Sequence, residues 1–286
     1  MTTLGQEALI RYCNGYQRED LENALRHFEC AWSSCSLSHP CRAAVLVNFA
    51  KTKFLSHQID PNSANFDQLI PLYREALDLR HCDHPDRPAT LLQLAQILLF
   101  RYEKQGCHNS VADMIHELTT ELLTFPENCH ERRAADLILD TLERCRVVNS
   151  GSVVELDQLV QKLQGSAIVP PDGYFDKPQR LINLSIALWR RYEKHGQVSD
   201  LECSAETNEQ ALELLQGRHL DRLPGLRTLA AVLWALFQTH GDFNYLIKLS
   251  ALTKEALQLI PEGHPECSYW VTGELLQQQS IHKMNL

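Results

Sequence analysis

The sequence predicts an all-α protein, a right-handed superhelical solenoid of antiparallel helix pairs with a period of 45 residues. Three observations support this. Residues 101–106 (Arg-Tyr-Glu-Lys-Gln-Gly) return almost unchanged at 191–196, two periods further along the chain. Apolar residues recur at helical spacing, and no run of alternating apolar residues lies between hairpin turns. A fixed period of this length is typical of solenoids, whose units pack on their neighbours.

Single positions repeat with the same step. One apolar position recurs six times, as Leu21, Phe66, Val111, Leu156, Leu201 and Leu246. A small residue recurs as Ala31, Ala76, Ala211 and Ala256. A histidine recurs in the turn between helices, as His39, His84, His219 and His264. Each repeat therefore has a B helix, a turn and an A helix.

The helices follow in order from these stripes and from the expected ends. An opening helix is expected near 3–14. B helices are expected near 20–35, 65–80, 110–124, 153–164, 200–216 and 243–260. A helices are expected near 41–57, 86–105, 131–148, 176–195, 221–240 and 266–282. The expected N-caps of the B helices are Asp20, Asn65, Ser110 and Asp200.

Local signals refine these helices. Ser110, Ser152 and Ser199 each stand three residues before an acidic side chain, as in a capping box. Pro71 lies inside an apolar stripe, which predicts a kink or a later helix start. The A helix at 131–148 keeps the repeat phase poorly.

The repeat extends over residues 1–286, so we expect one domain of about six helix pairs plus a terminal helix. The irregular segment at 165–175, which contains Pro170 and Pro171, is where a bend is expected.

Composition excludes several classes of function. With a net charge of -9, the chain does not resemble a nucleic-acid-binding or anionic-membrane-binding protein, both of which need a basic face. No apolar run approaches the roughly 20 residues of a membrane-spanning helix. The ten cysteines form no Cys-x-x-Cys pair, so we expect reduced thiols and a cytoplasmic location.

Within each repeat, small residues on the A helix (Ala50, Ala95, Ser185 and Ala230) and on the B helix (Ala24 and Ala31) lie where paired helices approach closely. This spacing resembles the tetratricopeptide repeat. The longer unit, with stretches such as 84–95 and 101–106, is similar to the long tetratricopeptide repeats of fungal multidomain proteins. The resemblance implies that the A helices line a concave groove.

That groove is the candidate binding surface. Its expected members are Asn48, Lys51, Leu92, Gln93, Gln96, Leu99, Asn183, Ile186, Trp189 and Trp234. An apolar groove of this kind would bind a protein or peptide, for example an amphipathic helix. The alternative is that the superhelix closes tightly and buries these groove residues. Trp189 and Trp234 are the expected hot spot, because aromatic anchors dominate interface energies.

A ladder of cations marks the starts of the A helices, at Arg42, Arg87, Arg132, Lys177 and Arg222. The helix macrodipole disfavours a cation there, so each needs a specific acceptor. One interpretation is a repeated inter-helix ion pair or a bond to loop carbonyls; the other is a track for an acidic peptide.

No catalytic or nucleotide-binding motif occurs, and we expect neither a metal nor a cofactor. The sequence thus favours a non-catalytic protein-binding scaffold. Two alternatives stay open. One is a self-associating module, such as a homodimer, that uses Leu4, Ile10, Leu275, Leu276 and Ile281 on the terminal helices. The other is an enzyme or small-molecule binder that uses the apolar interior.

Overall fold

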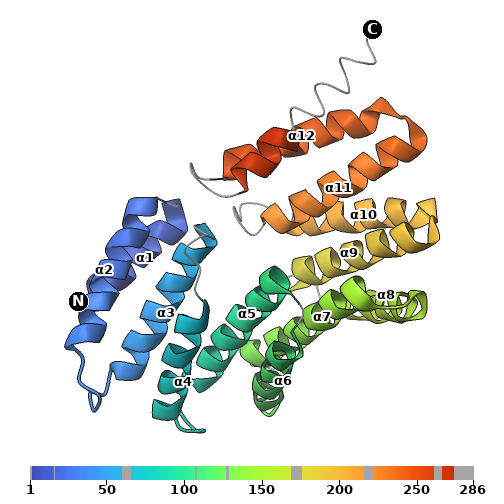
Figure 1. The fold of residues 1–286 in the computed structure, drawn as a ribbon. Coiled ribbons are helices and arrows are strands. Elements are labelled where there is room, and N and C mark those ends of the chain that lie inside the picture. The colour runs from blue at the N-terminus through green and yellow to red at the C-terminus, as the bar shows by residue number, and fades with distance from the viewer. Residues whose placement is uncertain are drawn as a thin grey trace. The chain divides into compact units, whose positions relative to one another are not determined.

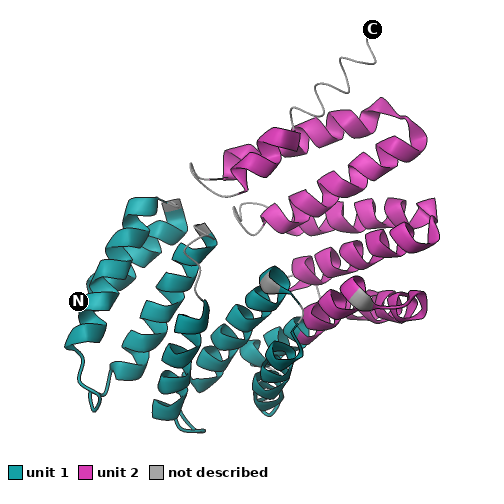
Figure 2. Ribbon diagram, viewed as in Figure 1, with its two compact units in different colours: residues 1–138, 263–265 teal, residues 139–262, 266–286 magenta. Residues whose placement is uncertain are grey.

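A computed structural model describes residues 2–15, 17–59, 66–106, 108–126, 129–168, 176–215, 222–260 and 266–273. These residues form α-helices, turns and a short 3₁₀ helix, and none of them lies in a β-strand. The all-α helical-repeat class predicted from the sequence is confirmed. The chain divides into two compact units around residues 1–138 and 139–262 (Figure 2).

Unit 1 consists of helices in which each packs on the next along the chain (Figure 1). They are α1 (Thr2–Gly15), α2 (Arg18–Ser34), α3 (Arg42–Ile59), the 3₁₀ helix η2 (Phe66–Gln68), α4 (Leu69–Leu79), α5 (Arg87–Gln105) and α6 (Asn109–Leu122). The A helices α3 and α5 also contact each other directly, across the B helix α4.

The division between the units falls inside α7 (His130–Ser150). Unit 2 continues with α8 (Val153–Ile168), α9 (Lys177–His195), α10 (Val198–Leu214), α11 (Leu223–His240) and α12 (Phe243–Leu259). The A helices α9 and α11 pack on each other and on the B helix α10 between them. Residues 267–273 are also helical, and Trp270 is buried there against the apolar cluster of α10 to α12.

The observed helices lie within a few residues of the predicted ones. Pro71 falls in the first turn of α4, because the segment begins with a 3₁₀ turn and the α-helix starts only at Leu69. The missing amide hydrogen of proline costs little in a first turn. The expected bend and the single-domain interpretation stay predictions, since residues 169–175 lie outside the described part of the chain.

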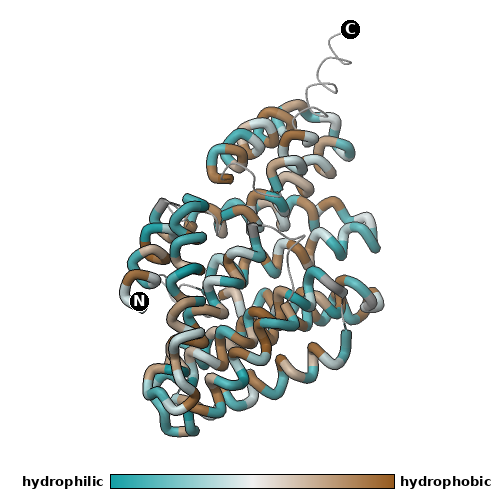
Figure 3. The backbone as a smooth tube through the Cα atoms, turned by 60° about the vertical axis from the view of Figure 1, so that its left-hand side comes forward, coloured by the Kyte–Doolittle hydropathy of each residue, from teal (hydrophilic) through white to brown (hydrophobic). Residues whose placement is uncertain are grey.

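The repeated apolar positions form the interior of both units. Leu21, Phe66, Val111, Leu156, Leu201 and Leu246 are all buried, as are Ala24, Ala50, Ala95 and Ser185. Helices such as α2, α4 and α6 carry apolar residues at helical spacing among polar ones, as amphipathic helices require, and Figure 3 shows both kinds mixed along the chain. Burial of a small residue where two helices cross lets the backbones approach closely, which explains why Ala50, Ala95, Ser185 and Ala230 share one position of the repeat.

Most of the predicted N-caps are wrong. The N-caps of α2, α6 and α10 lie two or three residues earlier than expected, at Gln17, His108 and Gln197 instead of Asp20, Ser110 and Asp200. The expected cap Asn65 lies outside the described residues. The predicted capping box at Ser110 and that at Ser199 therefore do not form.

One capping box is confirmed. The Ser152 amide donates to the Glu155 carboxylate at 2.7 Å, and the Glu155 amide donates to Ser152 Oγ at 3.3 Å.

Acidic side chains near the starts of three B helices also pair with arginines of the preceding helix. The guanidinium groups of Arg11, Arg146 and Arg191 each donate to the carboxylate nine residues later, on Asp20, Glu155 and Asp200. Each carboxylate occupies the third position of a B helix, where the macrodipole also favours it. The link ties the end of one helix to the start of the next. The ion pair with Asp200 raises the pKa of Arg191.

Glycine is the C-cap of the A helices α5, α9 and α11, at Gly106, Gly196 and Gly241. Gly196 and Gly241, one period apart, adopt left-handed φ values of 73° and 68°. Their amides donate to the carbonyls of Tyr192 at 2.7 Å and Phe237 at 2.8 Å. Only glycine adopts this conformation without a Cβ penalty, so the recurring glycine marks a recurring helix end.

The recurring histidine shapes the turn between B and A helices. His39 Nδ1 accepts a hydrogen bond from the Cys41 amide, and His84 Nδ1 accepts one from the Asp86 amide, both at 3.1 Å. The two turns thus use the imidazole Nδ1 as an acceptor for a backbone amide at the start of the A helix. His219 and His264 lie outside the described residues.

Candidate functional site

The two predicted hot-spot tryptophans lie on neighbouring A helices of unit 2. Trp189 on α9 and Trp234 on α11 are half-buried and pack against the apolar cluster of α10 to α12. The Arg190 guanidinium lies over the Trp189 ring at 4.8 Å from its centroid, and Trp234 contacts Phe237 at 5.7 Å between ring centroids. Each indole is therefore held from the interior side while part of it faces solvent.

Both indoles keep an uncommitted hydrogen-bond donor. Neither Trp189 Nε1 nor Trp234 Nε1 donates a hydrogen bond within the described part of the chain, and neither is among its buried unpaired polar atoms. One turn before each tryptophan, Ile186 and Ala231 are half-buried at equivalent positions of α9 and α11. We call the set Ile186, Trp189, Ala231 and Trp234 the A face of unit 2.

The residues expected on the same face of unit 1 are more polar. Lys51 and Gln96 are exposed, whereas Asn48, Gln93 and Leu99 are half-buried. Gln93 is partly committed to the interior, because the buried Tyr73 hydroxyl donates to Gln93 Oε1 at 3.3 Å.

Three phenylalanines of unit 1 pack together close to these residues in the sequence. Phe54 packs edge-on against Phe100 with 5.3 Å between ring centroids, and both contact Phe66. Phe54 and Phe100 are half-buried like Trp189 and Trp234, but their rings carry no hydrogen-bond donor, whereas each tryptophan has an indole N–H that donates to no described residue.

Two predicted groove residues lie in the interior instead. Leu92 is 7% exposed and Asn183 is fully buried. Asn183 Nδ2 donates to Thr141 Oγ1 at 2.8 Å, and its Oδ1 accepts from Arg144 Nε at 3.0 Å. The prediction was wrong for these two because the repeat phase treats all A helices alike, while the polar side chains of α7 cover Asn183.

A buried ion-pair network lies beside Asn183. Arg180 Nη1 donates to Asp140 Oδ2 at 2.9 Å, and Arg180 Nε donates to Asp176 Oδ2 at 3.0 Å. The side chains of Arg180 and Asp140 are 9% and 8% exposed. Asp140 occupies the position that is Ala50, Ala95, Ser185 or Ala230 elsewhere. This charged network explains why the third A helix keeps the repeat phase poorly.

Lys162 on α8 completes the network from its exposed side. Its ammonium contacts Asp140 at 3.2 Å and Glu143. Burial alone would lower the pKa of Lys162, but its hydrogen bonds to Glu143 and Asp140 outweigh that effect and raise the pKa.

The cation ladder is structural. The guanidinium groups of Arg42, Arg87, Arg132 and Arg222 donate to carbonyls at or just after the end of the preceding B helix: Cys35, Leu77, Phe125 and Leu212, at 2.6–2.9 Å. Three of them also pair with a glutamate 33 or 34 residues later, at Glu75, Glu121 and Glu255. The interpretation as inter-helix ion pairs and carbonyl bonds is confirmed for these arginines.

The ladder has a simple physical reason. The start of an A helix lies next to the C-terminal end of the B helix before it, where free carbonyls and the negative end of the macrodipole attract a cation. Each arginine that also reaches a glutamate on the next B helix therefore connects two successive repeats. These guanidinium groups are committed, so they do not form an open track for an acidic peptide.

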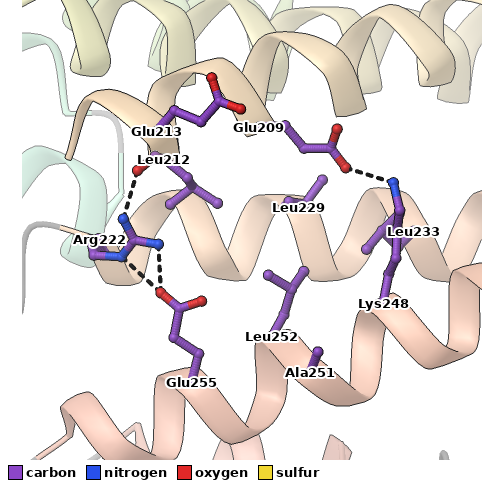
Figure 4. A pocket seen from close by; sticks show the side chains of 10 residues that line it. All are labelled: Glu209, Leu212, Glu213, Arg222, Leu229, Leu233, Lys248, Ala251, Leu252 and Glu255. Atoms are coloured by element: carbon purple, nitrogen blue, oxygen red, sulfur yellow. Dashed lines mark hydrogen bonds and ion pairs between the residues drawn. The ribbon is translucent and has the colours of Figure 1, made fainter. Parts of the chain in front are cut away.

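The structure also contains a groove that the sequence analysis missed. It has a volume of about 370 Å³ and lies between α10 and α12 over α11, and Figure 4 shows its lining. Its apolar lining consists of Leu212, Leu229, Leu233, Ala251 and Leu252. Ion pairs stand at two points of its rim: Arg222 with Glu255 at 2.8 Å, and Lys248 with Glu209 at 3.0 Å (Figure 4).

Other features of the described residues concern metals, thiols and membranes. No group of three metal-ligating side chains is found among them. Nine cysteines are free thiols, and the tenth, Cys107, lies outside the described part. None of the described helices is both long enough and apolar enough to cross a membrane.

Comparisons with known proteins identify no family. No protein-family model matches the sequence, and no curated protein matches it significantly. Among solved structures, the chain is similar to residues 1–338 of "Assembly Chaperone of RpL4 (Acl4)", with 14% identity, a TM-score of 0.40 and coverage of 98% of both chains. A likeness at this score defines neither the fold subclass nor a partner.

Proposed function

We propose that this chain is a non-catalytic protein-binding scaffold, and that the A face of unit 2 holds a segment of its partner. One observation carries the proposal: two tryptophans at equivalent positions of adjacent A helices are anchored from inside, are half-exposed, and donate no indole N–H hydrogen bond to the residues that the structure describes. Tryptophan is enriched among residues that dominate interface energies, because it combines a large apolar area with a hydrogen-bond donor.

The proposal includes the finer architecture expected from the sequence. The repeat resembles the tetratricopeptide repeat, in which the A helices line the concave side of a right-handed superhelix. The direct contacts of α9 with α11, and of α3 with α5, are consistent with that arrangement. The partner segment would be an amphipathic helix or an extended peptide with large apolar side chains, seated on Ile186, Trp189, Ala231 and Trp234.

The test replaces the two tryptophans. A protein captured from lysate is first identified and purified, and its affinity for the wild-type chain is measured by calorimetry. The double variant Trp189→Ala/Trp234→Ala is expected to weaken binding by about 30-fold or more for each side chain, since hot-spot truncations cost about 2 kcal/mol. The variant Trp189→Phe/Trp234→Phe keeps the rings and isolates the contribution of the N–H donors.

Trp32→Ala is the matched control, because Trp32 is a partly exposed tryptophan of unit 1 that stacks on Phe49. It is expected to leave the affinity unchanged. Equal affinities of wild type and the double alanine variant, with an unchanged helical circular dichroism spectrum, would refute this location of the site.

A second candidate function is self-association through the first helix. Leu4 and Ile10 on α1 are 51% and 59% exposed, as that alternative requires, whereas Leu275, Leu276 and Ile281 lie outside the described residues. Light scattering on a sizing column tests it: a dimer that Leu4→Glu/Ile10→Glu converts to a monomer would favour this function over the scaffold.

A further inference from the structure

The groove between α10 and α12 has one strongly acidic wall. Glu202, Glu206, Glu209 and Glu213 follow one another along α10 at steps of four, three and four residues, so they form one stripe on the helix surface. The α10 range, Val198–Leu214, contains no Lys, Arg or His. Glu209 and Glu213 line the groove itself.

Most of this negative charge is not neutralised within the described part of the chain. Glu209 pairs with Lys248, and Glu202 lies 3.8 Å from His240 Nε2, a contact that is an ion pair only if the imidazole is protonated. Glu206 and Glu213 are exposed and make no ion pair with described residues. Glu213 also lies in the last turn of α10, where the negative end of the macrodipole adds to its field.

The buried apolar lining of the groove is formed by Leu212, Leu229 and Leu233, and an incoming helix would meet Ala251 and Leu252 on α12 first. The walls of the groove are two helices and its floor is a third, so their backbone groups are paired within the helices and offer no edge for an added β-strand. Ala251 is small and exposed on the α12 wall, which leaves room for an incoming helix. The volume of about 370 Å³ falls within the range of about 300–1,000 Å³ that binding clefts occupy.

We propose that this groove docks an amphipathic helix of a partner protein, with its apolar ridge between α10 and α12 and lysine or arginine side chains along α10. Charge complementarity selects this occupant over an acidic or neutral one. The groove is distinct from the A face of unit 2. Leu229 and Leu233 line it from the side of α11 opposite to Ala231, because residues of a helix are rotated by about 100° each.

The test uses two synthetic helical peptides with the same leucine ridge. One carries lysines beside the ridge and the other carries glutamates. Binding to the full chain is measured by fluorescence anisotropy at two salt concentrations. The lysine peptide is expected to bind at least about 10-fold more tightly, and to weaken as salt increases, because exposed charges are screened.

Two variants locate the binding. Ala251→Trp fills the groove and is expected to abolish binding of the lysine peptide. Glu206→Lys/Glu213→Lys reverses two charges that make no ion pair with the described residues, and is expected to weaken binding by about 10-fold, as the sum of several modest rim interactions. Glu29→Lys/Glu117→Lys, which reverses two exposed glutamates of unit 1, is the charge-matched control and is expected to have no effect.

The outcomes separate this proposal from the proposed function. The variant Trp189→Ala/Trp234→Ala is expected to bind the lysine peptide normally. Equal binding of the two peptides, or binding that Ala251→Trp leaves unchanged in a folded protein, would overturn the groove proposal and leave the A-face proposal intact. A dimer in light scattering that Ala251→Trp dissociates would show that a second copy of the chain occupies the groove, and would overturn it as well.

Discussion

The two units have the same helical repeat and stabilise it differently. In unit 1, the residues at the crossings are small and apolar, as at Ala50 and Ala95, and Arg42 and Arg87 connect the repeats by pairing with the partly exposed carboxylates of Glu75 and Glu121. In unit 2, Asp140 and Arg180 form an ion pair in the interior. The same helical repeat is therefore compatible with small apolar residues or with an ion pair in its interior, provided that each buried charge has a partner.

The arginine ladder is interrupted at α9, the helix that carries Arg180 of the buried ion pair. At α9 the ladder position is Lys177, and the residues 33 and 34 further on are Gln210 and Ala211 instead of a glutamate. Arg87 joins α4 to α6 by bonding to the Leu77 carbonyl and to Glu121, and the sequence has no equivalent arginine–glutamate pair at α9. The interior pair of Arg180 with Asp140 connects α9 to α7 instead.

The largest effect is expected from breaking the interior ion pair. Asp140→Ala leaves the buried Arg180 with only Asp176 as an ion-pair partner. We expect the free energy of unfolding to fall by about 3 kcal/mol. The double variant Asp140→Ala/Arg180→Thr has the residues that unit 1 has at the equivalent repeat positions, Ala95 and Thr90. It should recover much of that loss. Urea unfolding followed by circular dichroism measures both. If the double variant is no more stable than the single one, the two chemistries are not interchangeable.

A smaller loss is expected from the ladder of unit 1. Arg87→Ala removes hydrogen bonds to the carbonyls of Leu77 and Arg80 as well as the pair with Glu121, and should cost about 2 kcal/mol. Glu121→Gln leaves the carbonyl bonds in place and should cost less than about 1 kcal/mol, since this carboxylate is 38% exposed. Thermal unfolding of the two variants compares these terms; equal losses would mean that the ion pair dominates.

The histidine turn of unit 1 should contribute less again. His84→Ala removes the acceptor of the Asp86 amide and should cost about 1 kcal/mol, whereas His84→Asn keeps a side-chain acceptor. Hydrogen exchange at the Asp86 amide reports the local effect. Unchanged protection in His84→Ala would show that the imidazole does not hold this turn.

The smallest effect concerns helix starts in acid. Hydrogen bonds from Ser152, first from its amide and then from its hydroxyl, keep the pKa of Glu155 below its ordinary value, with a further contribution from Arg146. The carboxylate therefore stabilises the start of α8 above the ordinary pKa of glutamate, and this stabilisation is lost as pH falls through the lowered pKa.

Exchange protection of the Ser152 amide should fall over that acidic range and become independent of pH in Glu155→Gln. The start of α6, where Ser110 forms no capping box, is the internal control and should not respond. A similar response at both helix starts would contradict the assignment.

Much of the architecture could be predicted from the sequence. The apolar stripes place each helix to within a few residues, because amphipathic spacing is a local property. The expected caps at Asp20 and Asp200 failed for a nonlocal reason: Arg11 and Arg191 bind these carboxylates, and the helices begin earlier. The regular spacing of glutamates along α10 is visible in the sequence too. It indicates a binding surface only beside the apolar groove, which α11 and α12 complete.

The sequence by itself determined the period, the helix class and the positions of the cation ladder, because each depends on residue types at regular intervals. Only the tertiary structure decided which equivalent residues are buried. Asn48 and Asn183 occupy the same phase, yet Asn48 is half-buried and Asn183 is enclosed by Thr141 and Arg144. The burial of a side chain depends on the neighbouring helix that packs on it, and that neighbour differs from repeat to repeat although the period does not.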